Sequence, residues 1–353
     1  SLAASPGEGS PEHALLQGPT RVVPREIPTI STRLIDPGVL PEQPAARRAI
    51  VSRLVDELRG SDPRVRIGYR GLERLEPSFI PVPLDDPGPI DGLADHATVL
   101  ITGGLGGIAL SLARSMAERR PLRFVLLGRA GLPPRDQWSD WAARHPDDVK
   151  TGRAIREVRA IEALGSTVDV RAADVTDTAA MTRLVSDVQE ASGGLDAVVH
   201  AAGVLDDGPL LGREVDRMRA VLGAKVAGAR ALDAAVGDTP LEFFVVFSSV
   251  SAVLGAAGQT DYAAANAFLD AFARDRERRT GQRTVSVGWG AWRDVGMAAE
   301  LAGRASYGGG DDEADLGEPL DHPLFERRTR DRDGRSAFRG RMAWGRHWML
   351  DEH

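Results

Sequence analysis

Two hydroxyl side chains, Ser249 and Tyr262, are spaced to act on one oxygen atom of a substrate. The run 241–247 is apolar, aromatic and β-branched, so it predicts a buried strand that ends in serines. The alanine-rich run 262–278 predicts a helix after a short glycine-rich turn. A serine at the end of a strand and a tyrosine in the first turn of the next helix can both donate to one carbonyl oxygen.

The spacing selects one serine of three. Ser249 stands thirteen residues before Tyr262, whereas we expect Ser248 and Ser251 to satisfy backbone groups of the loop. Asn266 is four residues after Tyr262 and shares its face of the helix. A lone tyrosine on a helix is more often a core or interface residue, so the catalytic interpretation depends on a nucleotide-binding motif upstream.

Such a motif lies between an expected strand at 98–101 and a helix that ends at Arg119. Its glycines let the backbone approach a pyrophosphate, and the helix N-terminus offers free N–H groups and a positive dipole. A glycine-rich turn alone is a weak signal, but another expected strand follows at 124–127, as in a βαβ unit. The expected cofactor-binding residues of this turn are Thr102, Gly103, Gly104, Leu105, Gly106, Gly107 and Ile108.

The ends of the next strands add further candidates. Arg129 suits the 2′-phosphate of NADPH, where a carboxylate would suit the ribose of NAD; the alternative is an ordinary surface arginine. Asp174, followed by Val175, could accept from the adenine amino group or cap a helix that begins near Thr178. Small residues after the strand 197–200 leave room for a nicotinamide ribose, and they are Ala201, Ala202 and Gly203. We assign His200 no catalytic role.

Lysine is almost absent. All but two of the 44 basic residues are arginine, and the exceptions are Lys150 and Lys225. Arginine is planar and bulky, whereas lysine delivers a compact charge, so a retained lysine can mark a position that arginine cannot fill. Lys225, in an expected long helix at 216–236, is therefore a candidate for the site.

Composition excludes several classes of function. The net charge of −7 gives no basic footprint, so we expect no nucleic-acid partner. The absence of cysteine excludes disulfides, thiolate metal sites and thiol catalysis, and we expect no metal. No apolar run approaches the length of a membrane span and residues 1–18 lack a signal-peptide core, so we expect a cytoplasmic protein without a membrane partner.

The order of elements predicts an α/β fold. Repeated strand–helix units from residue 97 indicate a doubly wound parallel sheet, with a polar surface insertion at 132–151. Residues 1–30 are rich in Pro, Gly and Ser and predict a linker. A helix at 44–59 and a short strand at 65–69 follow, before a proline-rich boundary.

Together these motifs resemble the short-chain dehydrogenase/reductase family, and 99–297 is similar to a ketoreductase domain of a modular polyketide synthase. The resemblance implies a Rossmann-type sheet and a partial structural subdomain. It rests on LLGR at 126–129, HAAG at 200–203, FSS at 247–249, YAAANAFLD at 262–270 and WG at 289–290.

The resemblance also implies a reaction: NADPH-dependent reduction of a β-ketoacyl thioester on the phosphopantetheine arm of an acyl carrier protein, beside neighbouring synthase domains. Tyr262 would donate the proton, Ser249 a hydrogen bond, and Lys225 would lower the pKa of the tyrosine. Asn266, where a typical short-chain reductase has lysine, would position Lys225 or a proton-relay water. Ala109 replaces the usual third glycine of the nucleotide turn, which we expect to be tolerated.

Leu205, Asp206 and Asp207 resemble the fingerprint of B-type ketoreductases, which implies a D-configured alcohol. The A-type tryptophan is absent at Leu254, and Ala264 replaces the proline of an epimerising subtype. The alternative is that the two acids face solvent or cap the next helix.

The resemblance also divides the chain. Residues 31–96 match a partial structural subdomain, 97–303 the catalytic ketoreductase domain, and 304–353 a linker and the start of a dehydratase-like segment, with His353 at the matching histidine. Two other interpretations stay open. A non-catalytic scaffold would be expected to lack the tyrosine or asparagine, and a free-standing carbonyl reductase would lack the flanking segments.

Overall fold

The computed structural model describes residues 10–60, 66–80 and 92–292, and three short strands between 318 and 339. Most described residues up to Trp289 form one compact unit, and those from Gly290 onward belong to a second unit together with 79–80. Within the described part of the chain, no helix has the length and apolarity that crossing a bilayer requires.

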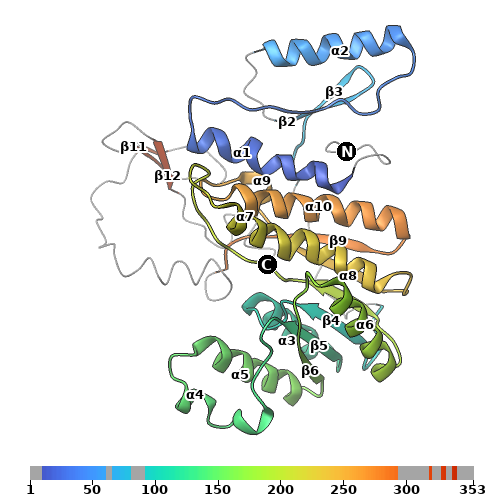
Figure 1. Ribbon diagram of the computed structural model, residues 1–353, viewed down its shortest axis with the longest axis vertical. Helices are drawn as coiled ribbons and strands as arrows, with labels where there is room; N and C mark the ends of the chain where they lie inside the picture. The colour runs from blue at the N-terminus through green and yellow to red at the C-terminus, as the bar shows by residue number, and fades with distance from the viewer. Residues whose placement is uncertain are drawn as a thin grey trace. The chain divides into compact units, whose positions relative to one another are not determined.

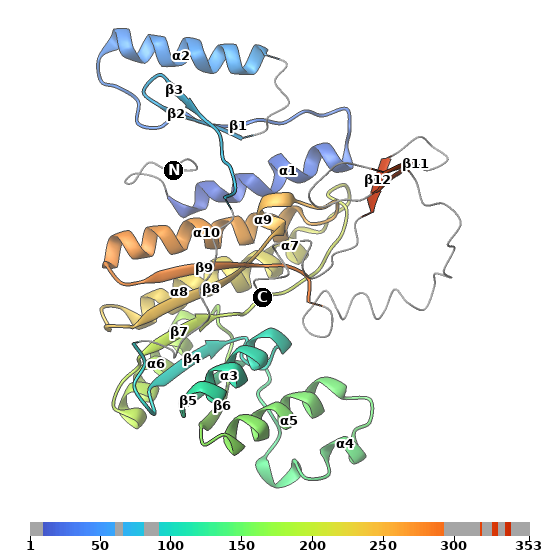
Figure 2. The same cartoon turned by 180° about the vertical axis from the view of Figure 1, so that it is seen from behind.

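Six parallel strands form the central sheet of the first unit (Figure 1), and their order is β6-β5-β4-β7-β8-β9 (Figure 2). The earliest strand of the set lies in the middle, so the chain crosses over between β6 and β7. This is the predicted doubly wound α/β sheet, with its switch point between β4 and β7. The strands are β4 (Thr98–Thr102), β5 (Arg123–Gly128), β6 (Thr167–Ala172), β7 (Ala197–His200), β8 (Phe243–Ser249) and β9 (Thr284–Trp289).

Helices cover both faces of this sheet (Figure 2). One face packs against α3 (Gly107–Arg119) and α5 (Val149–Ala163). The other packs against α6 (Thr178–Ser192), α8 (Gly228–Val236) and α10 (Thr260–Thr280). The sheet is therefore the middle layer of three, as the repeated strand–helix units predict.

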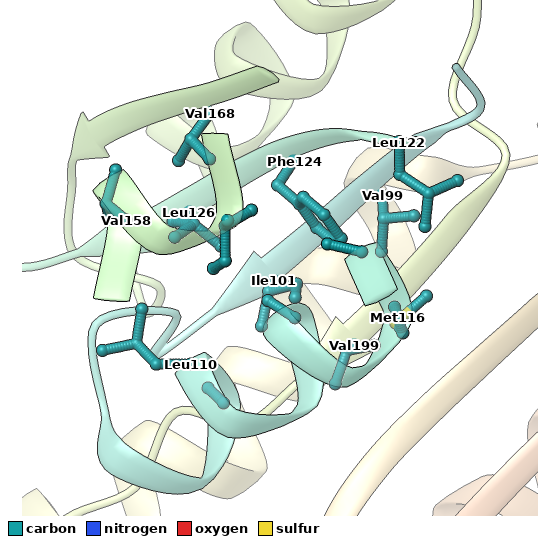
Figure 3. Close-up of a cluster of buried hydrophobic side chains, with 14 of the residues drawn as sticks. Val99, Ile101, Leu110, Met116, Leu122, Phe124, Leu126, Val158, Val168 and Val199 are labelled. Atoms are coloured by element: carbon teal, nitrogen blue, oxygen red, sulfur yellow. The ribbon is translucent and has the colours of Figure 1, made fainter. Parts of the chain in front are cut away.

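Strand β4 is buried along its whole length, so its apolar run is continuous rather than alternating. Successive side chains still point to opposite faces. Val99 and Ile101 belong to the cluster against α3 and α5 (Figure 3), whereas Leu100 belongs to the cluster against α6, α8 and α10. This central strand carries the glycine-rich turn at its carboxyl end.

The N-terminal segment corrects one expectation. We expected a linker over 1–30, but a 3-10 helix, η1 (Pro11–Leu16), leads into α1 (Gln17–Glu26), which packs against α10. A side chain at Gly18 would come within 2.2 Å of the carbonyl oxygen of Thr260. The glycine that suggested a flexible segment therefore permits close approach of two helices.

A three-stranded sheet follows in the same unit, in the order β1-β2-β3. The predicted helix is present as α2 (Pro44–Arg59), and the predicted strand as β2 (Arg66–Arg70). Strand β1 (Leu34–Asp36) pairs with β2 in parallel, and β3 (Glu73–Leu75) pairs with it antiparallel. Helix α2 buries Ile50 and Glu57.

The expected surface insertion at 132–151 is partly a core element. It holds a 3-10 turn, η2 (Arg135–Gln137), and a short helix, α4 (Trp141–Arg144). Trp138 is 5% exposed, packs in the cluster beside α3 and α5, and donates its indole N–H to the carbonyl of Pro133 at 2.8 Å. Its polar sequence neighbours concealed this role.

The second unit contains an antiparallel sheet of β10 (Glu318–Pro319), β11 (Arg327–Arg330) and β12 (Ser336–Arg339). His353 and most of the expected dehydratase-like segment lie outside the described residues.

Candidate active site

The carboxyl ends of β4, β7 and β8 meet at the edge of the sheet where ligands of doubly wound folds bind. Thr102 ends β4, Ala201 follows β7, and Ser249 ends β8. Tyr262 lies in the first turn of α10. The topology therefore brings the glycine turn, the small-residue segment and the two hydroxyls to one edge.

Tyr262 and its neighbours form the centre of the site. Burial raises the pKa of the Tyr262 phenol, and a hydrogen bond with the Ser249 side chain partly opposes that rise. Asn266, one turn further along α10, donates from Nδ2 to the carbonyl of Tyr262 at 2.8 Å. Its Oδ1 is buried and has no hydrogen-bond partner among the described residues. An unpaired buried acceptor beside the tyrosine can receive a water or a substrate group.

Lys225 approaches the same tyrosine from another element. The expected long helix is interrupted: α7 (Val215–Leu222) is followed by a π-helical turn (Gly223–Ala227) and then by α8. Lys225 lies in this turn, is 3% exposed, and donates from Nζ to the carbonyl of Phe247 at 2.8 Å. Its Nζ is 5.7 Å from the centroid of the Tyr262 ring. π-turns within helices frequently accompany functional sites.

Burial sets the charge state of this pair. It lowers the pKa of Lys225 to about 8, against the opposing charge of Asp270. It raises the pKa of Tyr262, and the side chains of Ser249 and Asn266 only partly oppose that rise. We expected Lys225 to lower the pKa of the tyrosine, but here burial decides the direction. At neutral pH the phenol keeps its proton and the lysine its charge.

The other serines behave differently from each other. Ser248 donates to the carbonyl of Asn266 at 3.1 Å, so it satisfies a backbone group of α10 rather than one of the loop. The backbone N–H of Ser251 donates to the Ser249 hydroxyl at 3.2 Å. The hydroxyl of Ser251 itself is buried without a partner in the described part of the chain, which differs from the expectation. Ser249 thus accepts from the backbone and keeps its own proton for another acceptor.

The glycine-rich turn fits a dinucleotide. Gly103 has a φ of 65°, and a Cβ there would come within 2.7 Å of the backbone of Ala201 and Ala202. Gly106 precedes the first turn of α3, and no side chain caps that helix. Its first N–H groups are therefore left for an anion, as a pyrophosphate requires. Ala109 is buried against the sheet, which agrees with a packing role.

Arg129 and Asp174 come together beyond the ends of β5 and β6. Arg129 is exposed, and its charge contributes to lowering the pKa of Asp174, after the hydrogen bonds from Thr176. Asp174 does not cap α6, because Asp177 accepts from the N–H of Ala180 instead. The capping alternative for Asp174 is therefore wrong. Val175, the next residue, is buried against the second face of the sheet.

The two acidic residues after β7 have different partners. Asp207 accepts from Gln259 Nε2 at 2.9 Å, and burial raises its pKa. Asp206 pairs with Arg217, which lowers its pKa. Neither acid caps α7. Leu205 is half-buried beside them, and Gly203, between these acids and Ala202, is also half-buried.

Sequence reasoning missed a buried ion pair next to the tyrosine. Arg213 and Asp261, with side chains 3% and 2% exposed, are 2.6 Å apart. The pair joins the loop that carries Asp206 to the first turn of α10. The two residues are 48 positions apart in the chain, so no local pattern pairs them. The sequence offered only one hint, an acidic residue in the first turn of a predicted helix.

Among the described residues, no group of three or more His, Asp or Glu side chains could hold a metal ion.

A family model described as the KR domain matches residues 97–294, more than half of the chain. The chain belongs to the KR domains of polyketide synthases. KR domains are oxidoreductases that convert a ketone to an alcohol with a nicotinamide cofactor.

Curated relatives are much longer proteins. Polyketide synthase GfsB of Streptomyces halstedii is 45% identical over 229 residues, which cover 64% of this chain and 4% of that protein. The 6-methylsalicylic acid synthase of Aspergillus terreus is 40% identical over 205 residues, which cover 58% of this chain and 11% of that protein. The KR domain thus spans a small part of each.

Solved structures agree with the fold. A ketoreductase from the first module of phoslactomycin biosynthesis in Streptomyces sp. HK803 is 35% identical with a TM-score of 0.68, covering 86% of this chain and 64% of that one. A structure titled as A-type ketoreductases from a modular polyketide synthase is 34% identical with a TM-score of 0.66, covering 86% and 60%.

Proposed function

We propose that this KR domain reduces the β-keto group of an acyl thioester carried by an acyl carrier protein, with NADPH as reductant, to a D-β-hydroxyacyl thioester. The observation that carries the proposal is the cluster of Ser249, Tyr262, Lys225 and Asn266 beside a glycine turn shaped for a dinucleotide.

Each side chain has a role in the transfer. The reduced nicotinamide, when bound, supplies a hydride to the carbonyl carbon. Tyr262 donates its proton to the carbonyl oxygen, and its raised pKa keeps that proton in place at neutral pH. Ser249 donates a hydrogen bond to the same oxygen and stabilises the negative charge that develops there. Lys225 supplies positive charge, and the free Oδ1 of Asn266 accepts from a water that returns a proton to the tyrosine.

The proposed cofactor contacts follow from the strand ends. Residues 102–108 would receive the pyrophosphate, Arg129 the 2′-phosphate, Asp174 and Val175 the adenine, and 201–203 the nicotinamide ribose.

Arg129→Ala is expected to raise the apparent KM for NADPH about tenfold and to leave that for NADH nearly unchanged. A charge-assisted hydrogen bond to the 2′-phosphate contributes roughly a factor of ten to affinity, and NADH lacks this phosphate. Initial rates with both cofactors measure it. Arg278→Ala, in the last turn of α10, is the control. Equal effects on the two cofactors would show that Arg129 does not contact the phosphate.

The reduction of a simple β-ketoacyl thioester is expected to give the D alcohol, (R) for a simple acyl chain. The loop of Leu205, Asp206 and Asp207 lies against Gln259, three residues before Tyr262, so it can limit how the phosphopantetheine arm enters. Chiral chromatography of the product measures the ratio. A predominantly L alcohol would contradict the B-type assignment and agree with the A-type relatives.

We also propose that the chain is divided as its resemblance implies: a partial structural subdomain over 31–96, a reductase over 97–303, and a dehydratase-like segment within 304–353. The carrier protein would present the substrate, and other synthase domains would flank the reductase.

The test compares NADPH oxidation with a β-ketoacyl N-acetylcysteamine thioester and with a simple ketone. We expect the thioester to be preferred. Equal or better use of the ketone would favour a general carbonyl reductase, and no oxidation with either would favour a scaffold.

A further inference from the structure

The last turn of α1 reaches two loops that flank the catalytic helix. Helix α1 lies along α10, as both views of the ribbon show (Figure 2). The charged residues of α1 are Arg21, Arg25 and Glu26. The two arginines bond to backbone carbonyls of α9, and Glu26 bonds to backbone N–H groups of the two loops. A helix at first interpreted as a linker is therefore attached to the active-site region.

Glu26 joins two segments that are distant in sequence. One carboxylate oxygen accepts from the N–H of Leu210 at 2.6 Å, and the other from the N–H of Gly258 at 2.8 Å. Leu210 belongs to the loop after β7, and Gly258 to the loop before α10. A carboxylate that accepts from two backbone N–H groups makes charge-assisted hydrogen bonds, which are stronger than neutral ones.

The two loops also bind each other at that point. The N–H of Gly208 donates to the carbonyl of Gly258 at 2.9 Å, and Gln259 Nε2 donates to Asp207 at 2.9 Å. Glu26 therefore closes a set of contacts that holds the acidic loop against the start of the catalytic helix.

The two arginines of α1 bind the segment between Ser249 and Tyr262 at a point before Gly258. Arg21 donates to the carbonyl of Val253, and Arg25 donates to that of Leu254 at 3.0 Å. These carbonyls lie at the end of α9 (Ser251–Leu254), where helix carbonyls lack partners within the helix. The two arginines thus bind backbone carbonyls, and the Glu26 carboxylate binds backbone N–H groups. The segment between Ser249 and Tyr262 is therefore held at Val253 and Leu254 by the arginines and at Gly258 by Glu26.

We propose that Glu26 is a positioning residue that sets the substrate entrance of the proposed ketoreductase. It holds the loop of Asp206 and Asp207 against the turn before Tyr262. The inference rests on the proposed function, because the loops matter for the direction from which a β-ketoacyl chain enters. If the two loops are loosened, the β-ketoacyl chain can enter in both orientations. Cofactor binding at the glycine-rich turn should not change.

Glu26→Gln tests the proposal, because the amide can accept from one N–H but turns its own NH₂ toward the other. We expect amide hydrogen exchange in peptides covering 206–212 and 255–260 to become about tenfold faster, as loss of one charge-assisted bond implies. The KM for a β-ketoacyl thioester should rise and the D-to-L product ratio should fall. NADPH binding, measured by fluorescence titration, should not change.

Glu12→Gln is the matched control, since Glu12 lies in the same N-terminal segment but pairs with Arg230 of α8 on the surface. Arg25→Gln is a second, exposed variant that should shift exchange and product ratio in the same direction if Glu26→Gln does not fold. Wild-type exchange and product ratio in Glu26→Gln would overturn the inference. If the wild-type protein reduces no thioester, the proposed function fails, and the exchange comparison alone decides whether Glu26 holds the loops.

Discussion

Tyr262→Phe is expected to lower the turnover of a β-ketoacyl thioester by at least about 10²-fold, the usual contribution of a positioned general acid. The substitution removes only the phenolic hydroxyl, whose proton the site presents beside Ser249. Without it the developing negative charge on the substrate oxygen receives no proton from the protein. The remaining hydrogen bond from Ser249 stabilises that charge only in part.

Steady-state kinetics and NADPH titration together measure this effect. NADPH affinity should be retained, because the ring stays in place. Tyr69→Phe is a matched control: Tyr69, in β2, donates to Glu57 of α2 at 2.7 Å, away from the expected chemistry. It should cost about 1 kcal/mol of the free energy of unfolding without changing turnover. Turnover at the wild-type level in Tyr262→Phe would exclude the tyrosine as proton donor.

Lys225→Arg is expected to lower kcat by about 10²-fold although the positive charge is kept. Lys225 is 3% exposed in its π-helical turn and its Nζ donates to Phe247 at 2.8 Å, so a planar guanidinium has no room to replace the ammonium. Moving the positive charge away from Tyr262 should lower kcat by as much as the loss of a general acid does. Lys150→Arg, at the only other lysine and in an exposed position, should have no effect.

The pH dependence separates charge from shape. Burial lowers the pKa of Lys225 to about 8, so the ammonium is present below that pH and is lost above it. The kcat/KM for NADPH, which reports the free enzyme, should therefore fall as the pH rises through about 8. In Lys225→Arg this fall should disappear at a lower overall rate, because arginine does not titrate there. A variant with the wild-type rate and profile would show that any positive charge suffices.

Much of the fold and the placing of the proposed site followed from local patterns. The doubly wound class could be predicted because strand and helix patterns alternate along the chain, and the continuous apolar run of β4 shows the buried parallel strand most clearly. Ser249, Tyr262 and Asn266 lie where strand end and helix periodicity put them. The scarcity of lysine pointed to Lys225 before any geometry was known.

Other features depend on contacts between distant residues, so no local pattern could predict them. Glu26 meets Leu210 and Gly258 across 184 and 232 positions of the chain. The segment that contains Gly18 was predicted to be a linker, because a glycine at a helix–helix contact has the same sequence signal as one in a linker. Trp138, in a polar segment, is buried only because the sheet provides a surface for it.

The electrostatics could not be predicted from residue types alone. A lysine near a tyrosine lowers the pKa of the phenol when the two share solvent, yet burial of Tyr262 raises it here. The π-helical turn was also invisible in the sequence, because its residues continue the helical pattern on either side. Both features depend on packing around the site.

The most direct test of the proposed reaction uses an acyl carrier protein loaded with a β-ketoacyl chain and NADPH that carries deuterium at the transferred position of nicotinamide C4. Mass spectrometry of the phosphopantetheine arm follows the product. We expect the carbonyl to gain one deuteride at the β-carbon and one proton from solvent at the oxygen, and the labelled product to form at least about 10²-fold more slowly in Tyr262→Phe. An unchanged arm, with the wild-type protein folded and NADPH bound, would contradict the proposed reaction.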